Sequence, residues 1–291
     1  MNKYQEGFKG DIFSAIFNLT GKTWLKVSGI YALNMLGMII IFGIVLVGLM
    51  GISQDMLKDL QDPAEVQKLT EEFTSLFTNP TNIIYLFIAL FAFGVIGSWG
   101  YYFAFILTEM QIKNGAADFN TALGYSFRRG VIELFLIGIL LYIIAVILIA
   151  LSFATYGLAS FLPFLLVPVC LLLIFRFTLV IPASIVGGYS FVESFNYSLK
   201  HITWVRSLKL VGISFLFITG ILTAYVIIGM ISLLFAVMAE IGQIIQFIVQ
   251  VAFGGFMMAL VVAALTALFY RYEEDIPGDD EVNLEDHLIA D

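Results

Sequence analysis

The chain has 291 residues, of which 60% are hydrophobic and 12% are charged, and its mean hydropathy is +0.98. A soluble domain carries about 25% charged residues, so this composition excludes an ordinary soluble globular protein and indicates a membrane protein. The formal net charge is −8, and no segment carries the basic footprint that nucleic-acid binding requires, so nucleic acid is excluded as a partner.

The N-terminal part of the chain predicts an amphipathic helix followed by a membrane hairpin. Apolar residues recur at three- and four-residue spacing over residues 8–17, which predicts a helix that lies in the membrane interface. Two uncharged stretches follow, Val27–Ile52 and Ile83–Thr108, and each exceeds the roughly 20 residues that a span needs. The loop between them, 53–80, contains a helix-start motif, DPAE, beginning at Asp62, so an outer amphipathic helix is expected there.

The second half of the chain predicts four further spans. Leu134–Phe175 contains no charged residue and is long enough for two spans with a tight turn near Thr155–Gly157. Leu210–Ala239 and Ile241–Tyr270 are the predicted fifth and sixth spans. The last segment, 272–291, is strongly acidic, which predicts a flexible tail.

A degenerate ten-residue pattern occurs once before each predicted hairpin, with a Phe first, an apolar residue fifth, a hydroxyl eighth and a cation tenth. The copies are Phe13–Lys22, Phe119–Arg128 and Phe191–Lys200. This recurrence indicates an internal repeat. The sequence therefore predicts an all-α, polytopic membrane protein with six transmembrane helices, arranged as three units of cytoplasmic amphipathic helix plus transmembrane hairpin. The units form one membrane domain, 1–271, with bounds near 8–115, 116–188 and 189–271.

Lys and Arg gather on one side of this predicted topology. With the N-terminus in the cytoplasm, twelve of the 14 Lys and Arg are cytoplasmic, and only Lys58 and Lys68 lie outside. Cytoplasmic loops of membrane proteins carry such an excess of cations. The sequence thus predicts a multi-pass protein of the bacterial inner (cytoplasmic) membrane with both termini in the cytoplasm and with membrane lipids as partners.

Residues that carry chemistry are sparse. No charged residue lies near the centre of a predicted span, and because charge in lipid is costly and usually functional, this disfavours an ion-coupled transporter and an intramembrane protease. The sequence contains no metal-binding or catalytic motif, and the single cysteine, Cys170, forms no internal disulfide. The chain is therefore expected to be no enzyme and to hold no metal or cofactor.

Two groups of polar residues in the predicted bundle are candidate sites. Glu133 and Arg176 lie near the cytoplasmic ends of adjacent antiparallel helices, and they form either a gate or headgroup contact or a structural ion pair. A polar stripe on the sixth span, together with one polar residue of the first, either lines a pathway or supplies interhelical hydrogen bonds. Its members are Asn34, Gln243, Gln246 and Gln250.

Cations in and near the repeat copies are candidate contacts for lipid headgroups. They form either a collar that binds lipid specifically or a simple anchor in anionic lipid, in which the hydroxyls of the pattern cap the next helix. These cations are Lys22, Arg128, Arg129, Lys200 and Lys209.

The segment Arg176–Trp204 carries a recognisable pattern. An Arg ends a span, Pro182 follows, and the sequence ESFNYSLK at Glu193–Lys200 precedes Trp204. This pattern resembles the bacterial six-span family of YciC-like proteins and is similar to the membrane domain of glycerophosphoryl diester phosphodiesterases. In the latter the hydrolase chemistry resides in a separate soluble domain, which nothing here matches. The resemblance implies an integral membrane module and not a phosphodiesterase.

The sequence thus favours a non-catalytic inner-membrane protein, a scaffold or accessory subunit of an envelope complex. Its protein partner is then another envelope protein or a second copy of the chain. The alternative is a transporter or channel for an uncharged or lipid-like substrate. The scaffold predicts a closed apolar interior, whereas the transporter predicts a continuous cavity lined by the glutamines and Asn34.

Overall fold

The computed structural model describes a chain that is built from helices. It covers residues 7–8, 10–45, 80–127, 130–154, 162–236 and 239–273. No strand occurs in these residues, so the all-α prediction is confirmed. The predicted outer loop, 53–80, lies outside the described residues except for Pro80, and so does the acidic tail beyond Glu273.

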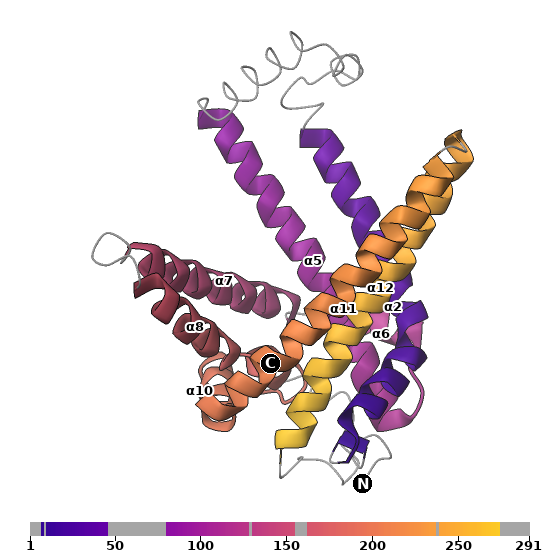
Figure 1. Cartoon of the computed structure of the whole chain (residues 1–291). Coiled ribbons are helices and arrows are strands. Elements are labelled where there is room, and N and C mark those ends of the chain that lie inside the picture. The colour runs from indigo at the N-terminus through magenta and orange to yellow at the C-terminus, as the bar shows by residue number, and fades with distance from the viewer. Residues whose placement is uncertain are drawn as a thin grey trace.

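Figure 1 shows the described helices and their order along the chain. They are α2 (Ile12–Gly43), α5 (Pro80–Asn114), α6 (Phe119–Tyr125), α7 (Gly130–Ala154), α8 (Leu162–Phe175), α9 (Val180–Ile185), α10 (Phe191–His201), α11 (Trp204–Ala236) and α12 (Ala239–Tyr272).

Within the described residues, five helical segments are long and apolar enough to cross a membrane, so the chain is a multi-pass membrane protein. Their bounds are Ile12–Gly43, Ile83–Asn114, Gly130–Leu151, Leu166–Ile185 and Ile244–Tyr272. The sequence predicts one more span on α11. That helix has 33 residues, but part of its side chains lie outside the described residues, and it is not among the five.

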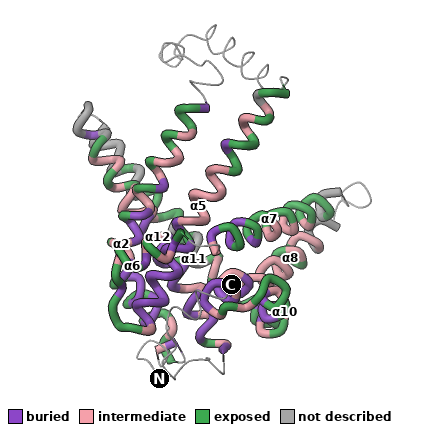
Figure 2. The backbone as a smooth tube through the Cα atoms, turned by 180° about the vertical axis from the view of Figure 1, so that it is seen from behind, coloured by how far each residue is buried: buried purple, intermediate pink, exposed green. Residues whose placement is uncertain are grey.

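The long helices converge at one end of the molecule and separate toward the other. In Figure 1, α2, α5, α11 and α12 lie close together at the lower end and diverge upward, while the α7–α8 hairpin leaves to the side. α12 packs along α2, and both pack on α5; α7 packs on α8 and α5, and α11 on α12 and α8. The buried core therefore lies where the helices converge, as the buried segments in Figure 2 show.

Two glycines let α2 pack closely on its neighbours. A Cβ atom at Gly100 of α5 would overlap the side-chain amide of Asn34, and one at Gly255 of α12 would overlap Ser28. Small residues at such positions let membrane helices approach closely, which is where their packing energy comes from. α2 is thus held on one side by α5 and on the other by α12.

The three copies of the ten-residue pattern take different forms. Phe119 and Phe191 begin the short helices α6 and α10, which are separate from the spans that follow. Phe13 instead lies in the first turn of α2, which continues without a break into the first span. The polar residues there do not stop the helix, because the hydroxyls of Thr20 and Thr23 donate to carbonyls one turn back, at 2.8 and 3.1 Å.

The hydroxyl at the eighth position is fully buried in each copy, at Thr20, Ser126 and Ser198. The prediction that these hydroxyls cap the following helix is wrong for Thr20 and Ser198, because Thr20 bonds within α2 and Ser198 bonds the segment after α8. The Ser126 hydroxyl accepts a hydrogen bond of 2.9 Å from the indole of Trp99 on α5. In the second and third copies the hydroxyl therefore ties the short helix to the preceding hairpin.

Candidate functional site at the basic end

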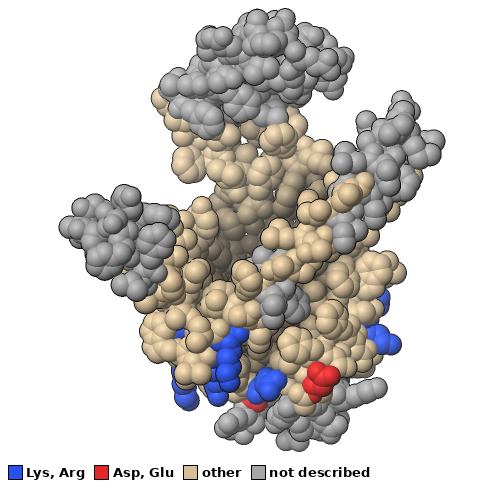
Figure 3. Space-filling model, in the orientation of Figure 1, with Lys and Arg blue, Asp and Glu red and all other residues tan. Residues whose placement is uncertain are grey.

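Charged side chains gather at the end where the helices converge. Figure 3 shows Lys and Arg at the lower end of the face in view, over α10 and the first turns of α11. Above them lies a hollow in front of α5, between the α7–α8 hairpin and α11, whose described walls carry neither Lys, Arg, Asp nor Glu. We call the lower end the basic end, because the Lys and Arg side chains of the face in view gather there.

Arg176 joins the segment after α8 to the junction of α10 and α11. Its Nε donates to the carbonyl of Ile202 at 3.0 Å and its Nη2 to that of Leu199 at 2.7 Å. Its guanidinium also lies over the ring of Trp204, 5.1 Å from the centroid. The Ser198 hydroxyl donates to the Arg176 carbonyl at 2.6 Å and accepts from the Leu179 amide at 3.0 Å. Four hydrogen bonds thus fix this junction.

Glu133 is not brought to Arg176. Glu133 lies in the first turn of α7 and is exposed, and although both residues are described, no ion pair joins them. The guanidinium fork is instead occupied by the carbonyls at the end of α10. A carboxylate in the first turn of a helix still interacts favourably with the helix dipole, so Glu133 has a local structural role of its own.

The structure describes three of the four side chains of the predicted polar stripe. Asn34 is 3% exposed and lies between α2 and α5, where its Oδ1 has no hydrogen-bond partner among the described residues. Gln250 is exposed and Gln246 is half-buried, while the side chain of Gln243 lies outside the described residues. Asn34 and Gln250 therefore differ in exposure, and Asn34 packs against Gly100 of α5.

The predicted headgroup cations are exposed wherever the structure describes them. Lys22, Lys200 and Lys209 are all exposed, which is compatible with contacts to lipid headgroups. Arg128 and Arg129 lie outside the described residues.

Arg206 is a cation that sequence reasoning did not single out. Its Nη1 donates to the carbonyl of His201 at 2.6 Å, and its guanidinium lies 4.5 Å from the ring centroid of Tyr272 at the end of α12. The residue nevertheless remains exposed. The sequence could have pointed to Arg206, because it lies three residues before Lys209 and residues at this spacing are neighbours on a helix.

A buried carboxylate lies near the end of α5. Glu109 is 1% exposed, and its Oε1 forms an ion pair of 2.5 Å with Nζ of Lys113 one turn later. A buried charge without a partner is strongly destabilising, so this pair allows a carboxylate to lie inside the basic end.

Aromatic and acidic side chains form a second cluster at the end of α12. Tyr197 stacks on Tyr189 and on His201, with centroid distances of 5.1 and 4.1 Å. The Tyr189 hydroxyl donates to Oε1 of Glu273 at 3.3 Å. Burial first, and the Glu273 carboxylate second, raise the pKa of both tyrosines above their usual value of 10.0. Both phenols therefore stay neutral at physiological pH.

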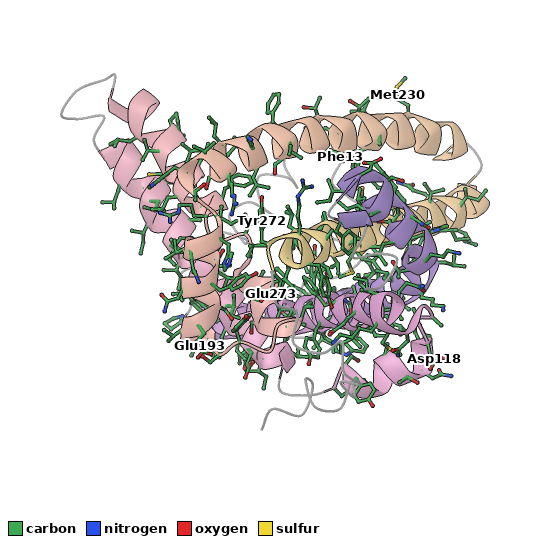
Figure 4. The ribbon with its side chains drawn as sticks, turned by 90° about the horizontal axis from the view of Figure 1, so that it is seen from below. Phe13, Asp118, Glu193, Met230, Tyr272 and Glu273 are labelled. Carbon is green, nitrogen blue, oxygen red and sulfur yellow. The ribbon has the colours of Figure 1, made fainter. Side chains whose placement is uncertain are left out.

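This cluster is suited to holding α12 in place. Nδ1 of His201 lies 2.9 Å from the carbonyl of Tyr197, and no hydrogen bond joins His201 to Glu273 within the described residues. A general acid or base has to be oriented toward its partner, and His201 and Glu273 are not oriented toward each other in this way. Seen from the basic end in Figure 4, Glu273 lies among the helices, whereas the helix caps Asp118 and Glu193 lie at the outer edge.

The part of the chain that the structure describes contains no group of three or more His, Cys, Asp or Glu residues that could hold a metal ion. No family model, curated protein or solved structure matches the chain. The class therefore rests on the fold: a helical, multi-pass membrane protein with five candidate spans.

Proposed function

We propose that the chain is a non-catalytic membrane module, a scaffold or accessory subunit of an envelope complex that receives a transmembrane helix of a partner protein. The supporting observation is a pair of exposed apolar faces, one on α5 and one on α7, where the two helices diverge. The two helices meet where Phe91 packs edge-on against Phe135, with ring centroids 5.0 Å apart, and where a Cβ atom at Gly94 would overlap the Phe135 ring. Beyond this contact they diverge (Figure 1).

Both helices continue from this contact with an apolar, exposed face. Residues three, four and seven positions apart lie on one face of a helix. On α5 this face is 58–67% exposed and consists of Ile84, Phe87, Ile88 and Phe91. On α7 it is 39–71% exposed and consists of Ile139, Tyr142, Val146 and Ile149. We call these eight residues the α5–α7 wedge.

The wedge has the features of a helix-docking surface in a membrane. Lipid tails are as apolar as leucine side chains, so membrane helices associate by close packing, and small residues at the contact allow it. Gly138 of α7 lies close to the wedge face, and a Cβ atom there would meet nothing within 4 Å. The backbone of α7 is therefore accessible to another helix. The aromatic rings of Phe87 and Tyr142 provide further packing surface on either side.

The topology of the module follows from the basic end. Because cations are enriched on the cytoplasmic side, we place this end in the cytoplasm of a bacterial cell. We also treat α11 as a transmembrane span, which brings the total to six. Six spans agree with the prediction of three units, each of which contains one transmembrane hairpin. The resemblance of Arg176–Trp204 to YciC-like proteins supports the same class and stays a prediction.

Site-specific photocrosslinking in living cells tests the proposal. A photoreactive amino acid at Phe87 or Tyr142 should give a discrete protein adduct. The matched control is Leu36 of α2, which is 47% exposed and points away from Asn34, since residues two positions apart face nearly opposite sides of a helix. Adducts to lipid alone, or equal protein adducts at Leu36, would rule out a partner helix in the wedge.

A binder or transporter of lipid-like molecules is the second candidate, because an apolar hollow with uncharged walls suits acyl chains (Figure 3). It predicts that Tyr142 is labelled by a photoactivatable lipid and that reconstituted protein accelerates lipid movement between the leaflets of liposomes. Unchanged lipid movement relative to protein-free liposomes would exclude transport.

A further inference from the structure

The junction between α10 and α11 combines exposed cations with exposed apolar side chains. We call residues 200–209 the α10–α11 corner. Its exposed cations are Lys200, Arg206 and Lys209. Its exposed apolar side chains are Trp204, Val205 and Leu208, at 48%, 66% and 61%. No Asp or Glu occurs between positions 194 and 239 of the sequence, so no nearby residue of this segment neutralises the cations.

Arg206 is held in a fixed position while it stays accessible. One of its terminal nitrogens is occupied by the His201 carbonyl, and the guanidinium plane rests on the Tyr272 ring. A guanidinium has five N–H donors, so donors remain for a ligand. Lys209 lies one turn further along the same helix and therefore on the same side. The two residues present a pair of cations to one anion.

The backbone that carries these cations is fixed from the inner side. Arg176 binds the carbonyls of Leu199 and Ile202, which flank Lys200 and precede Arg206. The Arg206 amide also donates to the hydroxyl of Thr203 at 3.4 Å. A site that is ordered before binding loses less conformational entropy when its ligand arrives. Arg176 thus fixes the backbone of the corner from the inside, and Arg206 remains exposed on its outer side.

We propose that the α10–α11 corner binds one anionic phospholipid. Its phosphate contacts Arg206 and Lys209, with Lys200 beside them, and its acyl chains lie along Trp204, Val205 and Leu208. Charge complementarity favours a headgroup with a net negative charge, because a zwitterionic headgroup brings an ammonium toward the cations. The interleaved apolar side chains favour a lipid over a soluble anion. This inference is independent of what occupies the α5–α7 wedge.

Native mass spectrometry of the full chain in mild detergent measures the binding. Phosphatidylglycerol is titrated against phosphatidylcholine with the same acyl chains, and one phosphatidylglycerol should bind in clear preference. A cation near a lipid surface contributes about 1 kcal/mol, so the double variant R206Q/K209Q should lose roughly thirtyfold in affinity for this lipid. The single variant Lys209→Gln, which leaves Arg206 on Tyr272, should lose about fivefold.

Arg271→Gln is the matched control, because Arg271 is an exposed cation on another helix, α12, outside the corner and outside the predicted headgroup contacts. The lipid affinity of this variant should match that of the unmodified chain. Equal loss in Arg271→Gln would show general attraction by net charge and overturn the site. Unchanged lipid binding in R206Q/K209Q, or equal binding of the two lipids, would also overturn it. Full competition by millimolar inorganic phosphate would identify a site for a soluble anion instead of a lipid.

Discussion

The basic end and the α5–α7 wedge belong to one apolar chain but are held together by different means. At the basic end, Arg176 and Ser198 make directed hydrogen bonds across three segments, and Glu109 is buried with its own counter-ion. The wedge is joined by ring and glycine contacts around Phe135.

The spans also differ in how much of them is buried inside the protein. A third of the most apolar part of α12, 33%, is buried inside the protein, against 11% for α5. Figure 2 shows the same change from buried segments near the convergence to exposed segments away from it. In lipid, an apolar face needs no protein partner, whereas a polar group does. The arrangement is therefore specified most tightly where polar groups require partners, and least tightly along the exposed apolar faces.

The largest expected effect comes from removing the arginine that fixes the basic end. Arg176→Leu leaves the carbonyls of Leu199 and Ile202 without their charged donor. Hydrogen bonds to charged groups contribute about 1.5–3 kcal/mol each, so the free energy of unfolding should fall by about 3 kcal/mol. Thermal unfolding in detergent, followed by circular dichroism, measures the loss.

Glu133→Gln serves as the control for this variant, because no ion pair joins Glu133 to Arg176 in the structure. Only the interaction of Glu133 with the dipole of α7 is weakened in this variant, so its melting temperature should fall much less than that of Arg176→Leu. A loss in Glu133→Gln as large as that in Arg176→Leu would mean that the two residues act as a pair and that the carbonyl contacts are secondary.

Two glycine substitutions sharpen the comparison between the packed region and the wedge. Gly255→Ala places a methyl group against Ser28 between α12 and α2, and overpacking of this kind costs about 1–3 kcal/mol. Gly138→Ala adds the same methyl group where nothing lies within 4 Å, and alanine is the better helix former, so stability should not fall. The same unfolding assay compares the two variants, and equal destabilisation would contradict an open wedge in the isolated chain.

The sequence predicted the helical class and the approximate place of the spans because these depend on long uncharged stretches. It predicted an interfacial helix separate from a span that begins at Val27, whereas α2 runs without a break from Ile12 to Gly43. Thr20 and Thr23 look like a polar boundary, yet their hydroxyls bond to the helix itself. Such back-bonding is a property of the folded helix that composition does not reveal.

The site was harder to predict, because its contacts join distant parts of the chain. A cation at the end of a span suggests a carboxylate partner, so Glu133 was the natural choice for Arg176. The real partners are main-chain carbonyls at the end of α10, and every residue has a carbonyl, so no sequence pattern marks them. Arg206 was missed for a similar reason. It lies at the start of α11, whereas Tyr272, whose ring it contacts, lies at the end of α12.

The smallest expected effect is on the pH dependence of the helix caps at the basic end. The carboxylate of Glu193 accepts from the hydroxyl and the amide of Ser190, at 2.6 and 3.0 Å. These hydrogen bonds, the hydroxyl first, hold the pKa of Glu193 below its usual value of 4.5. Protonation removes the acceptor charge, so the contribution of the cap is complete above pH 4.5 and is lost as the pH falls through the lowered value.

Hydrogen exchange of the Ser190 amide, measured between pH 6 and pH 3 and corrected for the intrinsic exchange rate, should therefore show falling protection below pH 4.5. Glu193→Gln should flatten this dependence, because its amide does not titrate in that range. The wedge contains no acidic side chain, so the protection of amides beside Phe87 should not change over the same interval. If protection there fell together with that of Ser190, acid would be loosening the whole bundle, and the basic end would not be a separate, electrostatically fixed region.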